Sequence, residues 1–84
     1  MGATIAPYEG ALYYSVQGEA VRQAVNNWIR TGKAFDAVLD FDAAIRDPTR
    51  PTRIKEGWHN GDHLHGSDAG YRALATSIDL SLFR

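Results

Sequence analysis

Residues 16–31 constrain the fold most, because they fit one amphipathic helix between two short apolar runs. The apolar side chains of this segment recur at helical spacing, at Val21, Val25, Trp28 and Ile29. Polar side chains, among them Arg22 and Asn26, fall largely on the opposite face. Ser15 is expected to cap the N-terminus of this helix, and Gly32 to end it as the C′ residue.

The two flanking apolar runs are predicted to be β-strands. Residues 3–6 form a short run stopped by Pro7 and are predicted to be a buried strand. Residues 35–41 form the second candidate strand, with Val38 and Leu39 at its centre. Strand, helix and strand in this order are typical of a right-handed βαβ unit with a parallel sheet. We therefore predict an α/β fold class and a single domain over residues 1–84, built as a minimal β-α-β-loop-α piece.

The second half of the chain is predicted to be a loop followed by a helix. Pro48 and Pro51 favour extended conformations in residues 46–55, so this segment is expected to be a loop and not a helix. Ser67 is a good N-cap for the final helix, and Asp68 suits the positive end of its dipole. The predicted apolar face of that helix consists of Tyr71, Leu74, Ala75 and Ile78, and Leu82 and Phe83 finish the chain.

Composition excludes several classes of protein. The chain of 84 residues has no cysteine, so it can form neither a disulfide nor a thiolate ligand. Its net charge of −1 argues against binding of a nucleic-acid polymer. No apolar run reaches membrane-span length, and the first residues lack the pattern of a signal peptide. A domain this small has a thin core, which metal binding or self-association could stiffen.

The histidines are concentrated in one stretch. All three lie within seven residues, 59–65, with Asp62 between them. Imidazole titrates near neutral pH and is a common metal ligand, so any chemistry of this chain is expected here first.

A metal site is one interpretation of this stretch. His63 and His65, two apart in an extended loop, would place both imidazoles on one side, as in many Zn²⁺ or Mn²⁺ sites. The remaining candidate ligands are carboxylates and one more imidazole: Asp62, His59, Asp42 and Asp40. A bound metal lowers the pKa of water from ~15.7 toward ~7 and so supplies a nucleophile. The alternative for Asp40 and Asp42 is that both cap or solvate the turn after the second strand.

A group of basic residues precedes the histidines. It comprises Arg46, Arg50, Arg53 and Lys55, which could form a positive rim for an anionic substrate, with a phosphodiester such as a cyclic nucleotide as the best guess. A solvated charged loop is the alternative interpretation.

Residues 62–71, Asp-His-Leu-His-Gly-Ser-Asp-Ala-Gly-Tyr, resemble the last conserved block of the SGNH (GDSL-type) esterases and lipases. Residues 2–5, 13–15 and 35–42 resemble the final third of that family in the same order, so the resemblance covers nearly the whole chain. It implies a flavodoxin-like three-layer α/β/α fold. It also implies that Asp62 orients the imidazole of His65 and that His65 is the general base.

The chain departs from the family pattern at several points. The Gly-Asp-Ser block with the nucleophile and the blocks that supply the oxyanion hole are not in this sequence, and Gly66 stands where the family usually has proline. Ser67 is expected to cap a helix and not to attack an ester. A triad reduced to orienter and base has no nucleophile to activate. We therefore predict a small metal-dependent hydrolase and not a serine esterase; the alternative is a non-catalytic fragment whose Asp–His pair is a relic. Both interpretations predict a homodimer or a higher homo-oligomer.

Overall fold

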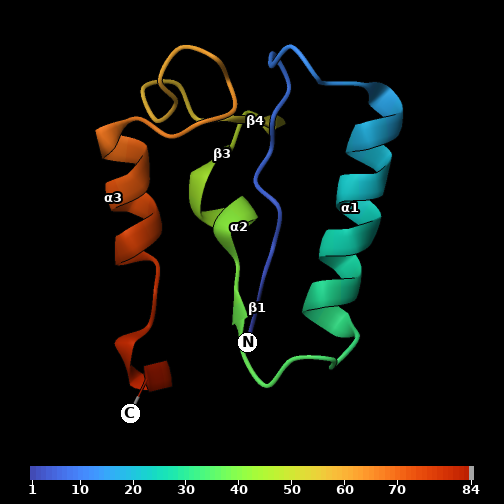
Figure 1. Cartoon of the computed structure of the whole chain (residues 1–84), viewed down its shortest axis with the longest axis vertical. Helices are drawn as coiled ribbons and strands as arrows, with labels where there is room; N and C mark the ends of the chain where they lie inside the picture. The colour runs from blue at the N-terminus through green and yellow to red at the C-terminus, as the bar shows by residue number, and fades with distance from the viewer. Residues whose placement is uncertain (84) are drawn as a thin grey trace.

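A parallel pair of strands joined by a long helix lies at the centre of the molecule (Figure 1). In this computed structural model, which describes residues 1–83, β1 (Gly2–Ala3) pairs with β2 (Val38–Leu39). The helix α1 (Val16–Thr31) connects the two strands. It lies on one side of them, and α3 (Asp68–Thr76) lies on the other (Figure 1). The predicted mixed α/β class and the parallel strand–helix–strand order are confirmed.

The first strand is shorter and less buried than predicted for residues 3–6. Thr4 still donates its backbone N–H to the carbonyl of Leu39 at 3.0 Å. The backbone N–H of Ile5, in contrast, donates to the side-chain oxygen of Asn26 in α1 at 2.7 Å. Ile5 is 46% exposed, so the prediction of a buried strand is wrong at this residue. The physical reason is that, within the described residues, β1 has a neighbouring strand on one edge only.

The second strand ends at Leu39 and does not continue to residue 41 as predicted. Asp40 instead caps a short helix, α2 (Phe41–Ile45), by accepting the backbone N–H of Ala43 at 3.1 Å. Asp42 therefore lies in the first turn of a helix and not at the end of a strand.

The bounds of α1 agree with the prediction, and so does its N-cap, because Ser15 accepts the N–H of Gly18 at 2.9 Å. The C-terminal end differs. Gly32 keeps a right-handed φ of −77° and donates its N–H to the carbonyl of Trp28, and Lys33 is the left-handed residue with a φ of 57°. The prediction of Gly32 as a C′ residue is therefore wrong.

The buried face of α1 also differs from the predicted one. Val21 and Trp28 are 62% and 53% exposed, whereas Arg22 and Asn26 are 2% and 0% exposed. Arg22 and Asn26 face inward because their side chains bind the backbone carbonyl of Ile5 at 3.1 and 2.9 Å. Hydrogen bonding to an otherwise unpaired strand edge outweighs the burial of apolar surface at this position.

Residues 46–55 form a β-hairpin and not a loop, which corrects the sequence-based prediction. The strand β3 (Arg46–Asp47) pairs antiparallel with β4 (Arg50–Ile54), and Pro48 lies in the turn between them. Oδ1 of Asp47 accepts the backbone N–H of Thr49 at 2.8 Å, which closes the turn.

The helix α3 begins where the sequence predicted. Oγ of Ser67 accepts the N–H of Gly70 at 3.1 Å, which confirms the predicted N-cap. The apolar face is only partly buried, since Tyr71 is 55% exposed and Ile78 lies beyond the end of the helix. The 3-10 helix η1 (Leu80–Phe83) follows.

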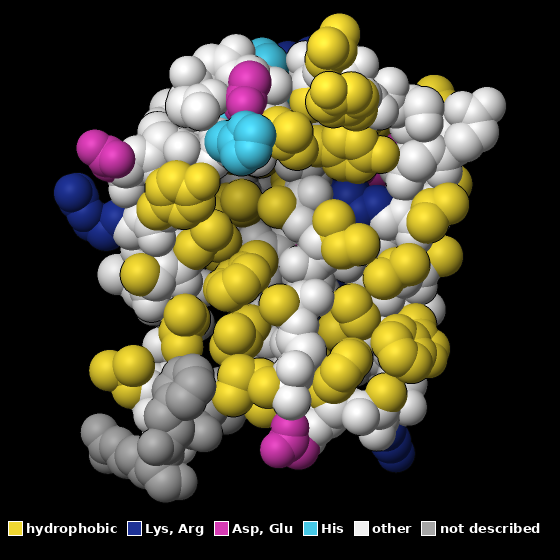
Figure 2. Space-filling view, in the orientation of Figure 1, with side chains coloured by type: hydrophobic (Ala, Val, Ile, Leu, Met, Phe, Trp, Pro, Cys, Tyr) yellow, Lys and Arg dark blue, Asp and Glu magenta, His cyan; other side chains and the backbone are white. Residues whose placement is uncertain are grey.

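Apolar surface remains exposed between α1 and α3, where Figure 2 shows many hydrophobic side chains gathered on one face. The buried hydrophobic core within the described residues is small and consists of Ala11, Ile29, Ile45 and Ile54. A homodimer could cover the exposed surface, and it stays a prediction. No helix in the described part of the chain is long and apolar enough to span a membrane.

Candidate functional site

The histidine-rich segment, residues 57–67, forms a loop between β4 and α3 (Figure 1). It lies beyond the carboxyl ends of β1 and β2, which is where open α/β sheets bind their ligands. The loop closes on itself through a bridge between His59 and Gly66 and a 3.0 Å hydrogen bond from Asn60 N–H to the carbonyl of His65. Gly10 packs against it from the segment before α1. Its φ of +100° and the 2.7 Å that would separate a Cβ from the ring of His63 both require glycine there.

Asp62 and His65 form a hydrogen-bonded pair at the surface of this loop. Nδ1 of His65 lies 2.6 Å from Oδ2 of Asp62. Oδ1 of the same carboxylate accepts the backbone N–H groups of Leu64 and His65, each at 2.8 Å. The hydrogen bond with His65, followed by those two backbone N–H groups, lowers the pKa of Asp62 from 3.8 to about 2. The carboxylate is therefore ionised throughout the neutral pH range.

This arrangement determines which ring nitrogen of His65 is available for chemistry. A carboxylate at Nδ1 keeps the proton on that atom and leaves the lone pair on Nε2. The side chain of His65 is 64% exposed, and Nε2 has no hydrogen-bond partner among the described residues. The pair therefore presents one accessible basic nitrogen held in a fixed orientation.

The other two histidines support the loop. The rings of His59 and His63 stack, with centroids 4.0 Å apart and planes inclined by 30°. Nδ1 of His59 accepts the backbone N–H groups of Gly61 at 3.0 Å and of His63 at 3.3 Å. His63 has a left-handed φ of 59°. His59 thus acts as an acceptor inside the turn.

The predicted metal ligands do not converge. In residues 1–83, no three His, Asp or Glu side chains are grouped so that they could hold an ion. His63 stacks on His59, whereas His65 binds Asp62, so the two imidazoles expected to share an ion have different partners. Nε2 of His59 and Nδ1 of His63 are buried without a hydrogen-bond partner, and Oε1 of Glu56 lies 3.4 Å from Nε2 of His59, yet within the described residues these groups do not form a set that could hold an ion. Two nitrogens on stacked rings fit neither a tetrahedral Zn²⁺ site nor an octahedral Mn²⁺ site.

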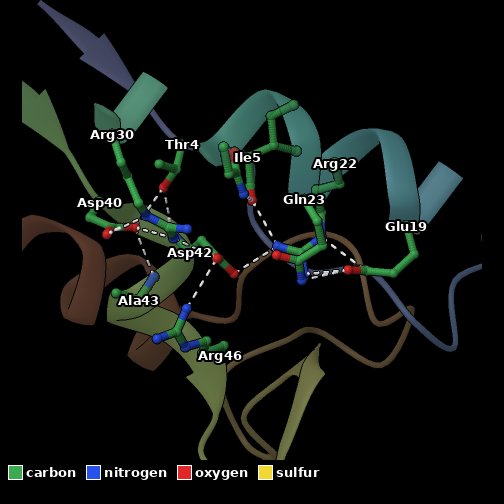
Figure 3. Close-up of polar contacts among 11 residues, drawn as sticks. Thr4, Ile5, Glu19, Arg22, Gln23, Arg30, Asp40, Asp42, Ala43 and Arg46 are labelled. Atoms are coloured by element: carbon green, nitrogen blue, oxygen red, sulfur yellow. Dashed lines mark hydrogen bonds and ion pairs between the residues drawn. The ribbon is translucent and has the colours of Figure 1, made fainter. Parts of the chain in front are cut away.

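The predicted ligands Asp40 and Asp42 belong to a separate network of ion pairs (Figure 3). Asp42 is 1% exposed and binds Arg22 at 2.7 Å, Arg30 at 2.7 Å and Arg46 at 3.2 Å. Arg30 also binds both oxygens of Asp40 at 2.9 Å and is the main cause that lowers the pKa of Asp40 to about 2. Both carboxylates are thus bound by arginines, and these ion pairs join α1 and β3 to the start of α2.

This network contains residues that the sequence did not single out. Arg22 donates to both carboxylate oxygens of Glu19, at 2.9 and 2.8 Å, in addition to its bonds with Asp42 and Ile5 (Figure 3). The helical periodicity of the sequence could have indicated these residues. The buried residues of α1 recur on one stripe of the helix and are Glu19, Arg22, Asn26 and Ile29. An ion pair three residues apart within that stripe is the pattern that could have revealed it.

The predicted basic rim is largely paired with acidic or aromatic groups. Arg46 binds Asp42, while Arg50 and Arg53 approach Glu9 at 2.8 and 3.5 Å. The hydrogen bond with Arg50 is the main cause that lowers the pKa of Glu9 to about 2. Nζ of the fourth member, Lys55, lies 4.7 Å from the ring centroid of Trp58.

Ser67 is not placed as a nucleophile. Its hydroxyl donates to the carbonyl of Gly57 at 2.8 Å and accepts the N–H of Gly70 at 3.1 Å. Both interactions belong to the N-cap of α3, as the sequence predicted. No hydroxyl group in the described part of the chain hydrogen-bonds with His65.

Comparisons with known proteins leave the family open: no protein-family model and no curated protein matches this chain. The resemblance to the SGNH hydrolases therefore stays a prediction from the motifs. The structure adds a geometric observation, namely that the Asp62 and His65 side chains of this motif are hydrogen-bonded to each other.

Proposed function

We propose that Asp62 and His65 are the orienter and general base of an ester hydrolase of the SGNH type. The observation that supports this proposal is the 2.6 Å hydrogen bond between Nδ1 of His65 and Oδ2 of Asp62, together with the exposure of the imidazole. The parallel β1–α1–β2 unit, with the loop beyond the carboxyl ends of its strands, supports the proposal that this chain is part of a flavodoxin-like three-layer fold.

The chemistry follows from the orientation of the imidazole. Nε2 of His65 would accept a proton from an attacking hydroxyl group and return it to the leaving alcohol. Asp62, ionised at neutral pH, would stabilise the imidazolium that forms between these two steps. The two backbone N–H groups on its other oxygen keep the carboxylate in place during the cycle.

In this proposal the nucleophile comes from outside the described residues. Ser67 is occupied as a helix cap, so the attacking hydroxyl would belong to a serine of another segment or another chain. Without such a serine, the pair can still deprotonate water that attacks an activated ester, at a much lower rate.

The geometry supports this function better than metal-dependent hydrolysis of an anionic ester. That prediction needs imidazoles and carboxylates around one ion, and a free positive rim for the substrate. Asp40 and Asp42 are held by arginines, and Arg50 and Arg53 are paired with Glu9. The Asp62–His65 pair, in contrast, is already hydrogen-bonded as a general base and its orienter would be.

The proposal is tested by hydrolysis of p-nitrophenyl acetate by the full chain at neutral pH. We expect His65→Ala to lower the protein-dependent rate at least about tenfold, since a positioned general base contributes roughly 10²–10⁴. Asp62→Asn keeps an oxygen that can accept the N–H groups of Leu64 and His65 but removes the charge, and should also lower the rate.

Asp79→Asn is the matched control. Asp79 is an exposed carboxylate that accepts the N–H of Ser81 at 2.9 Å and has no histidine partner, so this variant should keep the full rate. An unchanged rate in folded His65→Ala, or equal losses in Asp62→Asn and Asp79→Asn, would refute the proposal.

A further inference from the structure

Six consecutive backbone N–H groups of the histidine-rich segment, those of residues 60–65, are hydrogen-bonded within the segment itself. Five of them donate to side chains and one donates to a carbonyl. The acceptors are the side chains of His59, Asn60 and Asp62 and the carbonyl of His65. The shape of this turn is therefore set mainly by side chains and not by a regular backbone ladder.

His59 accepts the backbone N–H groups on both sides of Asp62. Its Nδ1 accepts the N–H of Gly61 at 3.0 Å and the N–H of His63 at 3.3 Å. Gly61 and His63 are the residues directly before and after Asp62. One ring nitrogen thus holds the backbone that carries the carboxylate of the Asp62–His65 pair.

His63 depends on His59 in a second way. Its left-handed φ of 59° is unfavourable for a residue with a Cβ, so the surroundings must hold it in that conformation. The ring of His59 stacks on the ring of His63, with centroids 4.0 Å apart, and its Nδ1 accepts the N–H of the same residue. Both interactions keep His63 in place directly after Asp62.

The ring of His59 is itself held in place. Its side chain is 5% exposed, and its backbone pairs with Gly66 across the turn. Because Nδ1 accepts two N–H groups, the ring carries its proton on Nε2, which lies 3.4 Å from Oε1 of Glu56. His59 is thus a buried acceptor, whereas His65 has an exposed imidazole.

We infer that His59 is a positioning residue, whose Nδ1 fixes the backbone on both sides of Asp62 and so keeps the carboxylate in contact with the imidazole of His65. The inference rests on the proposed hydrolase function and adds to it a residue that acts only through this pair. Displacement of a catalytic group by about 1 Å can lower a rate roughly 10²-fold, so the acceptor matters for the chemistry and not only for the loop.

Two substitutions of His59 separate the acceptor from the packing of the ring. His59→Asn places an oxygen one bond from Cγ, as Nδ1 is, so it can accept both N–H groups. His59→Gln places its oxygen one atom further along the side chain, so it fills more of the volume of the ring but withdraws the acceptor. A role as acceptor predicts that asparagine replaces histidine better, and a role in packing predicts that glutamine does.

The inference is tested by long-range ¹H–¹⁵N correlation spectra of the full chain, which give the tautomer of His65 without any ester. We expect His59→Asn to keep the proton of His65 on Nδ1. His59→Gln should move a clear share of it to Nε2, because the imidazole loses its carboxylate partner. Hydrolysis of p-nitrophenyl acetate should be largely kept in His59→Asn and fall roughly tenfold or more in His59→Gln.

Asp47→Ala is the matched control, since Asp47 accepts the N–H of Thr49 at 2.8 Å in a different turn, that of the β3–β4 hairpin. Its loss should change neither the tautomer of His65 nor the rate. An unchanged tautomer in folded His59→Gln would overturn the inference. So would loss of the Nδ1–H form in folded His59→Asn, which is decisive even if the glutamine variant does not fold.

The two proposals fail separately. A changed tautomer of His65 in His59→Gln, with no effect of His65→Ala on hydrolysis, would retain His59 as the residue that positions the pair and refute the hydrolase. Loss of hydrolysis in His65→Ala, with the tautomer of His65 unchanged in His59→Gln, would retain the base and refute the role of His59.

Discussion

Asp62 holds His65 in two ways at once: Oδ2 lies 2.6 Å from the imidazole Nδ1, and Oδ1 accepts the backbone N–H of the same residue at 2.8 Å. The side chain and the backbone of His65 are thus fixed by one carboxylate. Asp62 therefore both shapes the loop and orients the imidazole. Asp62→Asn separates these roles, because asparagine keeps an oxygen that accepts the backbone N–H groups but removes the negative charge.

The first prediction concerns the tautomers of two histidines. His65 should carry its proton on Nδ1, which faces a carboxylate, whereas His59 should carry it on Nε2, because its Nδ1 accepts two backbone N–H groups. Long-range ¹H–¹⁵N correlation spectra of the neutral rings distinguish the two forms. Asp62→Asn should alter the tautomer balance of His65 and leave that of His59 unchanged. The same tautomer in both rings would contradict the structure.

The second prediction is the acid limit of the loop. The pKa of Asp62 is about 2 in the folded chain against a usual value of 3.8, so its interactions stabilise the fold fully above about pH 4. That contribution is lost as the pH falls from about 4 through 2, because the carboxyl group takes up a proton and its hydrogen bond with His65 weakens. Urea denaturation measured between pH 5 and 2 should show a smaller pH dependence for Asp62→Asn than for the unmodified chain.

Local patterns in the sequence predicted the elements that depend on neighbouring residues. The caps Ser15 and Ser67 and the bounds of α1 follow from side chains that bind backbone groups a few positions away, and these are confirmed. The parallel pairing of β1 with β2 follows from the order of apolar runs.

What the sequence did not reveal depends on contacts between residues far apart in the chain. Arg22 was placed on the solvent face of α1 because it is charged, yet it is buried against Asp42, twenty positions away. The pairing of Arg50 with Glu9 spans 41 positions and neutralises part of the predicted rim. Periodicity within one helix carries no information on partners far along the chain, so the sequence did not predict that these arginines form ion pairs. The Asp62–His65 pair was predictable because its members are three residues apart in one turn.

The third prediction concerns the buried network. Asp42→Asn should lower the free energy of unfolding by about 3–5 kcal/mol, because it leaves the buried Arg22 without one of its two carboxylate partners. Asp36→Asn is the control: that carboxylate is 89% exposed and pairs with the N-terminal amine at 3.1 Å, so its loss should cost much less than the loss of Asp42. Thermal or urea denaturation monitored by circular dichroism measures both. Similar costs for the two variants would show that the network contributes little.

The fourth prediction separates the cap of α3 from catalysis. Ser67→Ala should lower the free energy of unfolding by about 1 kcal/mol, since the N–H of Gly70 loses its acceptor. Hydrolysis of p-nitrophenyl acetate, measured where the variant is fully folded, should be unchanged, because the hydroxyl of Ser67 bonds to Gly57 and Gly70 and not to His65. A loss as large as that of His65→Ala would assign Ser67 to the chemistry and contradict its role as a cap.

The fifth prediction concerns metal ions. Because His63 stacks on His59 while His65 binds Asp62, a divalent ion would have to break the Asp62–His65 hydrogen bond and unstack the other two rings to gather three ligands. We therefore expect EDTA to leave both the hydrolysis rate and the thermal midpoint unchanged, and Zn²⁺ or Mn²⁺ to raise neither. His63→Ala should loosen the loop, since its ring packs against Gly10 and His59, without a change in metal content. The opposite result would be that His63→Ala and His65→Ala each remove a bound metal and the activity together. The histidine-rich loop would then have to rearrange around an ion, and a metal-dependent hydrolase would explain the activity better than the Asp62–His65 pair.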